Sequence, residues 1–120
     1  MDVDGLKAIN DGNGHHAGDL ALPAVARALR TGARQTDLGA RLGGDEFALL
    51  APSTPRAAAA ALGERIRSLV EEQGIVGLTV SVGVATPQRG GPSGAGLLRE
   101  AADGALYEAK HQGRNRVVSA

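Results

Sequence analysis

Strict alternation of apolar residues with polar or small ones marks positions 78–85, where Val80, Val82 and Val84 are expected to share one face. A period of two is typical of a strand that is buried on one side, so this segment is predicted to be a half-buried β-strand. Residues 1–4 alternate apolar and acidic residues in the same way, and residues 115–119 are read as a short closing strand. These two segments are the predicted first and last strands.

Two apolar segments, 38–42 and 46–51, flank a Gly-Gly-Asp-Glu tetrapeptide at positions 43–46. Glycine adopts positive φ at little cost, so the chain can reverse sharply there and pair its flanks as antiparallel strands. The pattern predicts a β-hairpin with two acidic residues at its tip. The hairpin by itself is explained equally well by an exposed turn with two solvated carboxylates and by a cation site.

Apolar residues at positions 22, 25, 26 and 29 recur at the spacing of one helix face and predict a helix over residues 16–33. Pro23 lies inside this span and lacks a backbone donor, so we expect a kink or a helix that effectively starts later. The remaining pattern predicts a helical turn over 5–11, a loop over 11–14, a helix from Thr54-Pro55 to a stop at Gly74, a loop over 87–96 and a helix over 97–112.

The predicted order is strand, helix, strand, strand, helix, strand, helix, strand, in a chain of 120 residues that suffices for one domain with a sizeable core. A hairpin placed between helix-connected strands indicates the α+β class. We expect an antiparallel-containing central sheet with helices packed around it. This arrangement corresponds to a ferredoxin-like β-α-β-β-α-β core built on split β-α-β units.

Composition narrows the functional classes. Hydrophobic residues make up 42% of the chain but aromatics only 2%, so Ala, Leu and Val must fill the core. The 13 basic and 13 acidic residues balance, which argues against a general nucleic-acid or membrane-surface binder. The lack of Cys excludes disulfides and thiolate metal sites. No apolar run approaches the roughly 18 residues of a membrane span and no signal peptide opens the chain, so we expect a cytoplasmic domain.

Candidate carboxylates lie at the end of the first strand and at the hairpin tip. If these strands are neighbours, Asp2 and Asp45 meet at one edge of the sheet. Two or three oxygens from carboxylates and backbone suit Mg²⁺, which keeps several waters and takes other ligands from substrate phosphates. The alternative is that Asp2 and Asp4 merely start a loop.

Other polar residues are candidates for nucleotide contacts. Lys110 and Arg114, four residues apart, either clamp phosphates, with Lys7 joining them, or only complement a helix C-terminus. Asn10 and Asp19 flank a Gly-rich segment and could read a guanine edge, although the sequence alone favours a helix cap as the role of Asp19.

A cation and an anion stand three residues apart just before the hairpin, as Arg34 and Asp37. A surface ion pair, worth little in stability, is the ordinary interpretation of such spacing. From the residues alone, this pair has no assigned function.

Four motifs that combine acids, glycines and cations at fixed spacing occur over nearly the whole chain, and together they resemble the GGDEF family of diguanylate cyclases. The motifs are Asp2-x-Asp4-x-x-Lys7-x-x-Asn10-Asp11-x-x-Gly14-His15-x-x-Gly18-Asp19; Arg41-x-Gly43-Gly44-Asp45-Glu46-Phe47; Ser81-Val82-Gly83-Val84-Ala85; and Ala105-Leu106-Tyr107-x-Ala109-Lys110-x-x-Gly113-Arg114-Asn115.

The resemblance implies an enzyme that condenses two GTP molecules into cyclic di-GMP and releases two pyrophosphates. In such a homodimer each of two antiparallel domains holds one GTP, and the 3′-hydroxyl of one GTP attacks the α-phosphate of the other. The resemblance also implies a palm-like nucleotidyl-cyclase fold and Mg²⁺, or Mn²⁺, as the cofactor.

The same resemblance assigns roles by position to metal ligands, a second catalytic acid, substrate contacts and a product-inhibition site of the form RxxD. The metal ligands are Asp2, the Val3 carbonyl and Asp45; the second acid is Glu46; the guanine contacts are Asn10 and Asp19; the further substrate contacts are Lys7, Lys110 and Arg114; and the product site is Arg34, Asp37 and Arg65.

Two further expectations follow from the resemblance. Domains of this family begin with a helix and most of the first strand, so residues 1–120 are expected to be a single GGDEF domain that lacks this N-terminal helix and the start of the first strand. The alternative function is a catalytically inactive GGDEF domain that senses cyclic di-GMP or GTP and regulates a partner.

Overall fold

The structure is a computed structural model that describes residues 1–13, 15–92 and 94–120. Strands and helices are mixed along the chain, as the α+β prediction requires. In chain order they are β1 (Asp2–Asp4), α1 (Leu6–Asn13), α2 (His15–Gly32), β2 (Leu38–Gly43), β3 (Glu46–Leu50), α3 (Arg56–Glu71), β4 (Thr79–Val84), α4 (Ala95–His111) and β5 (Val117–Ser119).

The strands form one sheet in the order β2-β3-β1-β4-β5, with β1 at its centre. Strand β1 is antiparallel to both of its neighbours, β3 and β4, whereas β4 and β5 are parallel. The units β1–α2–β2 and β3–α3–β4 are therefore split β-α-β units, each with a strand of the other unit between its own two strands. This interleaving is the ferredoxin-like core, and the predicted fold class is confirmed.

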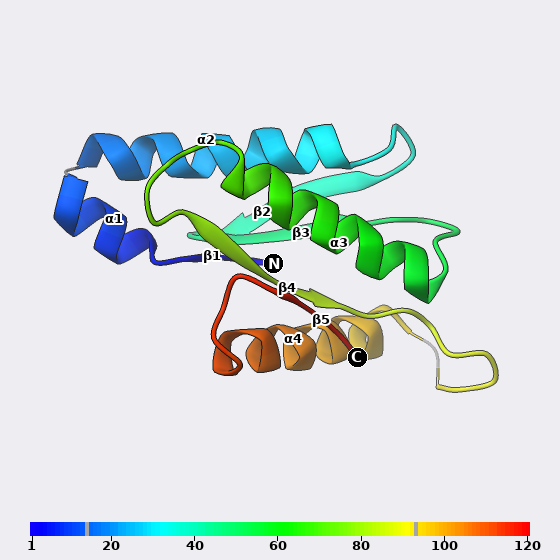
Figure 1. The fold of residues 1–120 in the computed structure, drawn as a ribbon. Coiled ribbons are helices and arrows are strands. Elements are labelled where there is room, and N and C mark those ends of the chain that lie inside the picture. The colour runs from blue at the N-terminus through cyan, green and yellow to red at the C-terminus, as the bar shows by residue number, and fades with distance from the viewer. Residues whose placement is uncertain (14, 93) are drawn as a thin grey trace.

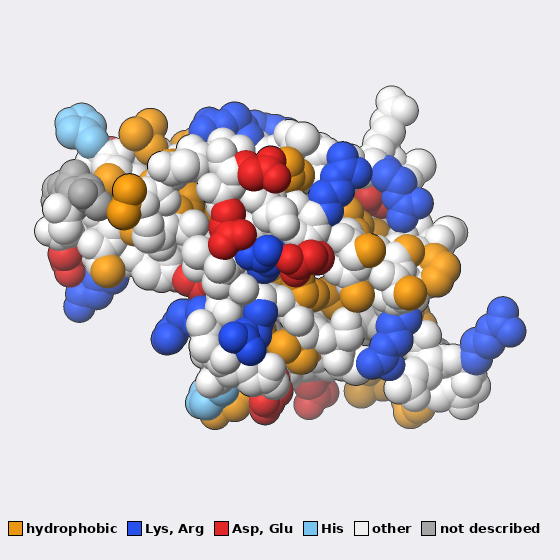
Figure 2. All heavy atoms as spheres, viewed as in Figure 1, with side chains coloured by type: hydrophobic (Ala, Val, Ile, Leu, Met, Phe, Trp, Pro, Cys, Tyr) orange, Lys and Arg blue, Asp and Glu red, His pale blue; other side chains and the backbone are white. Residues whose placement is uncertain are grey.

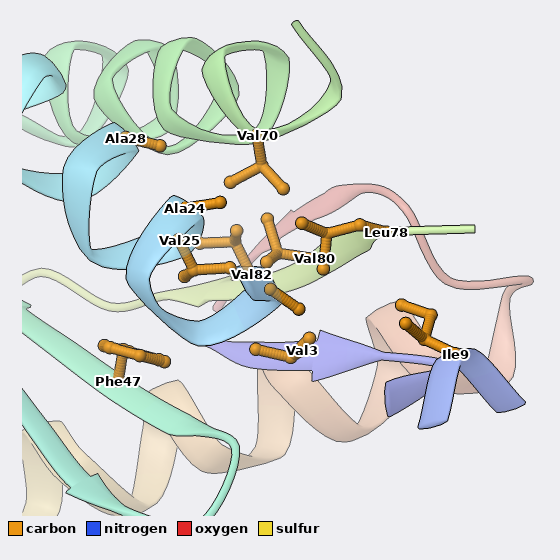
Figure 3. Close-up of a cluster of buried hydrophobic side chains, with 11 residues drawn as sticks. Val3, Ile9, Ala24, Val25, Ala28, Phe47, Val70, Leu78, Val80 and Val82 are labelled. Carbon is orange, nitrogen blue, oxygen red and sulfur yellow. The ribbon is translucent and has the colours of Figure 1, made fainter. Parts of the chain in front are cut away.

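Helices cover both faces of the sheet: α2 and α3 lie on one side and α4 on the other (Figure 1). The larger core lies under α2 and α3, where the strands contribute Val3, Phe47, Val80 and Val82 (Figure 3). The alternation predicted for β4 is confirmed, because Val80 and Val82 are buried in this core while Ser81 points to the other face and contacts β1.

Helix α4 approaches β4 unusually closely at Gly83. A Cβ atom added to Gly83 would lie 2.1 Å from the Ala102 carbonyl oxygen and 2.4 Å from the Leu106 backbone nitrogen. Small residues on the facing side of the helix, Ala105 and Ala109, are buried at this contact. The close packing fixes where the C-terminal end of α4 lies relative to the centre of the sheet.

Two local predictions were wrong, and of the two alternatives predicted at Pro23, a kink or a later helix start, the later start is excluded. Residues 11–13 belong to α1 and not to a loop, because α1 packs along α2 and buries Ile9; Gly14 lies outside the described residues. Helix α2 begins at His15, so it does not start after Pro23; the buried stripe of α2 offsets the one missing backbone bond. Helix α4 begins at Ala95, inside the loop predicted over 87–96, of which Ser93 lies outside the described residues.

Among the described residues, no helix combines the length and the apolar character needed to cross a membrane.

Candidate functional site

The end of β1 and the tip of the β2–β3 hairpin lie in direct contact. The Val3 amide donates to the Asp45 carbonyl at 3.0 Å, and the Phe47 amide donates to the Met1 carbonyl at 2.9 Å. Asp2 is paired in register with Glu46 across this ladder, so their side chains share one face of the sheet. The segments that carry Asp2 and Asp45 therefore meet, as the sequence predicted.

The hairpin tip is held by Arg41, which belongs to the second sequence motif but had no predicted role. The Arg41 guanidinium donates to the Gly44 carbonyl through Nε at 3.0 Å and through Nη2 at 2.7 Å. Gly44 has φ +44°, a left-handed conformation that favours glycine. The two hydrogen bonds fix the turn in which Asp45, a half-buried residue, presents its carboxylate.

Asp2 is buried at the centre of the sheet, so the prediction that it merely starts a loop is excluded. Its Oδ2 atom accepts a hydrogen bond from the Lys110 ammonium of α4, so the structure brings a predicted phosphate contact onto a predicted metal ligand. Its Oδ1 atom is buried and has no hydrogen-bond partner in the described part of the chain. A buried carboxylate oxygen without a partner is unfavourable unless a cation or a donor reaches it.

The residues present fit a hard cation such as Mg²⁺. Asp2 offers the unpartnered Oδ1, and Asp45 follows the hairpin turn beside it. The Val3 carbonyl faces the hairpin tip too, since the Val3 amide points there and both groups of a strand residue point to one side. In the described ranges no three His, Asp or Glu side chains form a metal cluster. Mg²⁺ does not require one, because it is commonly held by one or two carboxylates, waters and substrate phosphates.

Asp4 also belongs to the buried part of β1, although the sequence reasoning gave it no role. Its carboxylate accepts from Thr79 Oγ1 at 2.9 Å, from Ser81 Oγ at 2.8 Å and from the Asn115 amide nitrogen at 3.1 Å. It therefore ties β1 to β4 and to the turn that follows α4. Arg114, the second predicted phosphate contact, lies exposed in this turn with φ +63°.

The two predicted guanine contacts lie on α1 and α2. Asn10 packs against Gly18, and its Oδ1 atom is buried without a partner in the described ranges. Asp19 is exposed and lies inside α2, after the first turn, so the prediction that it caps the helix is wrong. Lys7 is exposed on α1. The structure thus leaves the amide oxygen of Asn10 and the carboxylate of Asp19 available on neighbouring helices.

Two of the predicted product-inhibition residues, Arg34 and Asp37, form a compact turn before β2, and the third, Arg65, lies on α3. The Arg34 amide donates to Asp37 Oδ2 at 2.7 Å and the Asp37 amide donates to the Arg34 carbonyl at 3.0 Å. The Arg34 guanidinium reaches Thr54 Oγ1 at 2.7 Å. Arg65 of α3 donates to the Thr31 carbonyl at 3.4 Å, on the adjoining end of α2. The ion pair between Arg34 and Asp37 does form, with the Asp37 side chain fully buried.

An open groove of about 670 Å³ runs between α2 and the hairpin. Its floor is apolar, and at one end it includes Leu22, three residues after Asp19. The other end includes Arg34 and Asp37. The groove therefore includes two of the predicted product-site residues and follows α2 towards the helical turn that carries Asp19, but neither Asn10 nor Asp19 lines it.

Comparison with known proteins agrees with this fold. The family model "Diguanylate cyclase, GGDEF domain" matches residues 1–116, so the chain belongs to the GGDEF family. It is 47% identical over 123 residues to the diguanylate cyclase DgcM of Escherichia coli, covering 100% of this chain and 30% of that protein. It is 42% identical over 124 residues to diguanylate cyclase A of Treponema denticola, covering 98% of this chain and 33% of that protein. The chain thus spans about a third of the length of these relatives.

Solved structures give the same result. The active GGEEF domain of a diguanylate cyclase from Vibrio cholerae superposes with a TM-score of 0.88 at 30% identity, covering 98% of this chain and 78% of that one. The GGDEF domain of DgcB from Caulobacter crescentus, in complex with c-di-GMP, superposes with a TM-score of 0.86 at 34% identity, covering 98% and 73% of the two chains. The family resemblance read from the motifs is confirmed.

Proposed function

We propose that the chain is the catalytic domain of a diguanylate cyclase that condenses two GTP molecules into cyclic di-GMP and releases two pyrophosphates. The observation that carries the proposal is the junction at the sheet centre, where Asp2, Asp45 and Lys110 come together from three distant segments. A buried carboxylate with an unpartnered oxygen beside a second acid supports a metal-dependent phosphoryl reaction. The reaction needs two GTP molecules, so the active form is a homodimer in which each protomer holds one.

In this proposal Asp2, Asp45 and the Val3 carbonyl hold Mg²⁺, or Mn²⁺, and Glu46 is the second acid beside it. When bound, the cation neutralises phosphate charge and aligns the attacking 3′-hydroxyl with the α-phosphate. Lys110 donates to Asp2 in the structure, so its role as a triphosphate contact requires its ammonium group to turn from the carboxylate to the phosphates. Two cations from one helix end, Lys110 and Arg114, then balance the triphosphate charge.

Guanine recognition is assigned to Asn10 and Asp19, and Lys7 of α1 is a further contact for the substrate phosphates. A carboxylate accepts the N1–H and exocyclic amino groups of guanine together, a pair that adenine does not offer. The unpartnered Oδ1 of Asn10 supports this assignment, because a buried acceptor without a partner favours a ligand donor.

Replacing Gly18 with alanine is expected to weaken GTP binding about tenfold, because the new Cβ would lie 1.5 Å from Asn10 Oδ1 and displace that side chain. Titration calorimetry with GTP measures the change. Gly12→Ala is the matched control: it lies in α1, and nothing stands within 4 Å of its added Cβ. Equal affinities in the Gly18 and Gly12 variants would remove Asn10 from the guanine site.

Arg34 and Asp37, with Arg65, are proposed to bind the product and arrest the enzyme. We expect Arg34→Ala to lose binding of cyclic di-GMP while GTP turnover at low product stays near that of the unmodified protein, because the turn lies away from the Asp2–Asp45 junction. Calorimetry with cyclic di-GMP and initial-rate assays measure the two effects. Arg99→Ala, which removes one exposed partner of an ion pair on α4, is the control. Unchanged product binding in Arg34→Ala would mean that Arg34 and Asp37 form only an ordinary surface ion pair.

The proposed function is tested by incubating the protein with GTP and Mg²⁺ and measuring cyclic di-GMP and pyrophosphate, with ATP as the control substrate. Formation of both products from GTP, and of neither from ATP, is expected. Binding of GTP or cyclic di-GMP without synthesis would overturn the proposal in favour of a sensing or interaction module.

A further inference from the structure

The turn that follows α4 has an unusual backbone. Gly113, Arg114 and Asn115 have φ values of +115°, +63° and +44°, which makes three successive residues with positive φ. Glycine adopts such angles readily and asparagine tolerates them, but arginine does so only under constraint from its surroundings. The conformation of Arg114 therefore requires contacts that hold the turn in place.

The end of α4 does not by itself require three successive residues with positive φ. The Arg114 amide donates to the Ala109 carbonyl at 3.0 Å, a bond that closes the end of α4 around Gly113. One glycine is sufficient for a helix end of this kind. The two further left-handed residues instead carry the chain back towards β1, where the Asn115 amide donates to Asp4 at 3.1 Å.

Asn115 joins the turn to α3 through both the oxygen and the nitrogen of its side-chain amide, while Arg116 Nε donates to the Arg114 carbonyl at 3.1 Å within the turn. The Oδ1 of Asn115 accepts from Arg67 Nη1 at 2.8 Å and its Nδ2 donates to Glu71 Oε1 at 2.7 Å, both on α3. With its backbone amide on Asp4, Asn115 joins the turn to a helix and to the central strand.

The α3 side of this contact is a rigid ion-pair network and not a single surface pair. Arg67 contacts Glu64 at 2.6 Å and Glu71 at 2.7 Å, and its side chain is only 15% exposed. These hydrogen bonds, that to Glu64 above all, raise the pKa of Arg67 above its ordinary value, and the hydrogen bond from Asn115 lowers the pKa of Glu71. Figure 2 shows acidic and basic side chains in contact on the face beside α3. A planar guanidinium bound on several edges presents a fixed donor to Asn115.

We propose that Asn115 and Arg67 are positioning residues: through the turn after α4 they set the direction of Arg114 towards the phosphates of bound GTP. The inference rests on the proposed function, because it takes Arg114 as a triphosphate contact. In this scheme Asn115 does not contact the substrate: it acts through Arg114, the residue before it, and through Asp4, which lies two residues after Asp2 on β1.

The test compares Asn115→Gly with the unmodified protein in cyclic di-GMP synthesis, at a temperature well below both melting midpoints. Glycine keeps the left-handed backbone and the amide that binds Asp4, so only the side-chain contacts with α3 are removed. We expect KM for GTP to rise about tenfold, the equivalent of losing one charge-assisted hydrogen bond, with kcat nearly unchanged. Arg67→Met is expected to act in the same direction, and Arg67→Lys, which keeps the charge without the planar fork, to lie between.

Arg99→Met is the matched control, because it also breaks an i,i+4 ion pair but on the exposed side of α4. If Asn115→Gly lowers the melting midpoint and leaves KM unchanged, the network is only structural and the inference is wrong. If the unmodified protein makes no cyclic di-GMP, the proposed function is wrong. The inference about Asn115 is then tested on its own, by calorimetry with GTP and Mg²⁺. A tenfold weaker affinity in Asn115→Gly would then support it, and equal affinities, or no binding by either protein, would overturn it.

Discussion

Asp45→Asn is expected to reduce cyclic di-GMP synthesis by about a hundredfold or more while the melting midpoint stays nearly unchanged. Metal coordination supplies several kcal/mol of charge stabilisation in phosphoryl transfer, and each 1.36 kcal/mol is about tenfold in rate. The carbonyl of residue 45 still accepts from the Val3 amide in the variant, so the backbone of the hairpin tip is retained. Asparagine has nearly the shape of aspartate, so the change removes charge and leaves the packing intact.

Asp103→Asn is the control for this prediction, since it neutralises an exposed acid of α4 that pairs only loosely with Arg99. It should leave both turnover and melting unchanged. Turnover in Asp45→Asn close to that of the unmodified protein would remove Asp45 from the metal site. Loss of activity together with a large fall in the midpoint would instead give Asp45 a structural role.

Gly83→Val is expected to destabilise the protein by about 3 kcal/mol or more, measured by chemical denaturation. The added Cβ would meet backbone atoms of Ala102 and Leu106 at 2.1 Å and 2.4 Å, and backbone cannot move aside as a flexible side chain can. Helix α4 must therefore shift away from β4 and carry Lys110 away from Asp2. A domain has a total stability of only about 5–15 kcal/mol, so the loss is a large part of it.

Gly104→Ala is the matched control in the same helix, because nothing lies within 4 Å of its added Cβ. Alanine has a higher helix propensity than glycine, so this variant should be slightly more stable, by roughly 0.5–1 kcal/mol. If Gly83→Val melts like Gly104→Ala, the close approach of α4 to β4 does not exist as described.

The fold was predictable where a strong hydrophobic period coincided with clear turn residues. The alternation around Val80 and the glycines at the hairpin tip located β2, β3 and β4 to within a few residues, and their order indicated the ferredoxin-like core. The prediction failed at residues 11–13, where glycine and polar residues favour a loop locally but packing of α1 on α2 extends the helix. Tertiary contacts override weak local preference at such places.

The site was predictable only in part. The meeting of Asp2 with Asp45 follows from strand neighbours, but the contacts of Asp2 with Lys110 and of Asp4 with Asn115 join residues 108 and 111 positions apart. No local pattern encodes such distances. Arg67 likewise has the sequence spacing of an ordinary helix-surface ion pair with Glu64 and Glu71, and nothing in that spacing indicates its contact with Asn115.

The central position of β1 in the sheet has a consequence for the order in which the protein folds during synthesis. Of the described elements, β1 is synthesised before the others, at roughly 5–20 residues per second, yet its acids find their partners only when the end of α4 and the turn beyond it have followed. The hairpin and the helices α2 and α3 can collapse earlier through contacts closer in sequence, but non-local pairing of this kind is intrinsically slow. The two buried carboxylates of β1 therefore gain their hydrogen-bond partners late in folding, after the end of α4 and the turn beyond it have been synthesised.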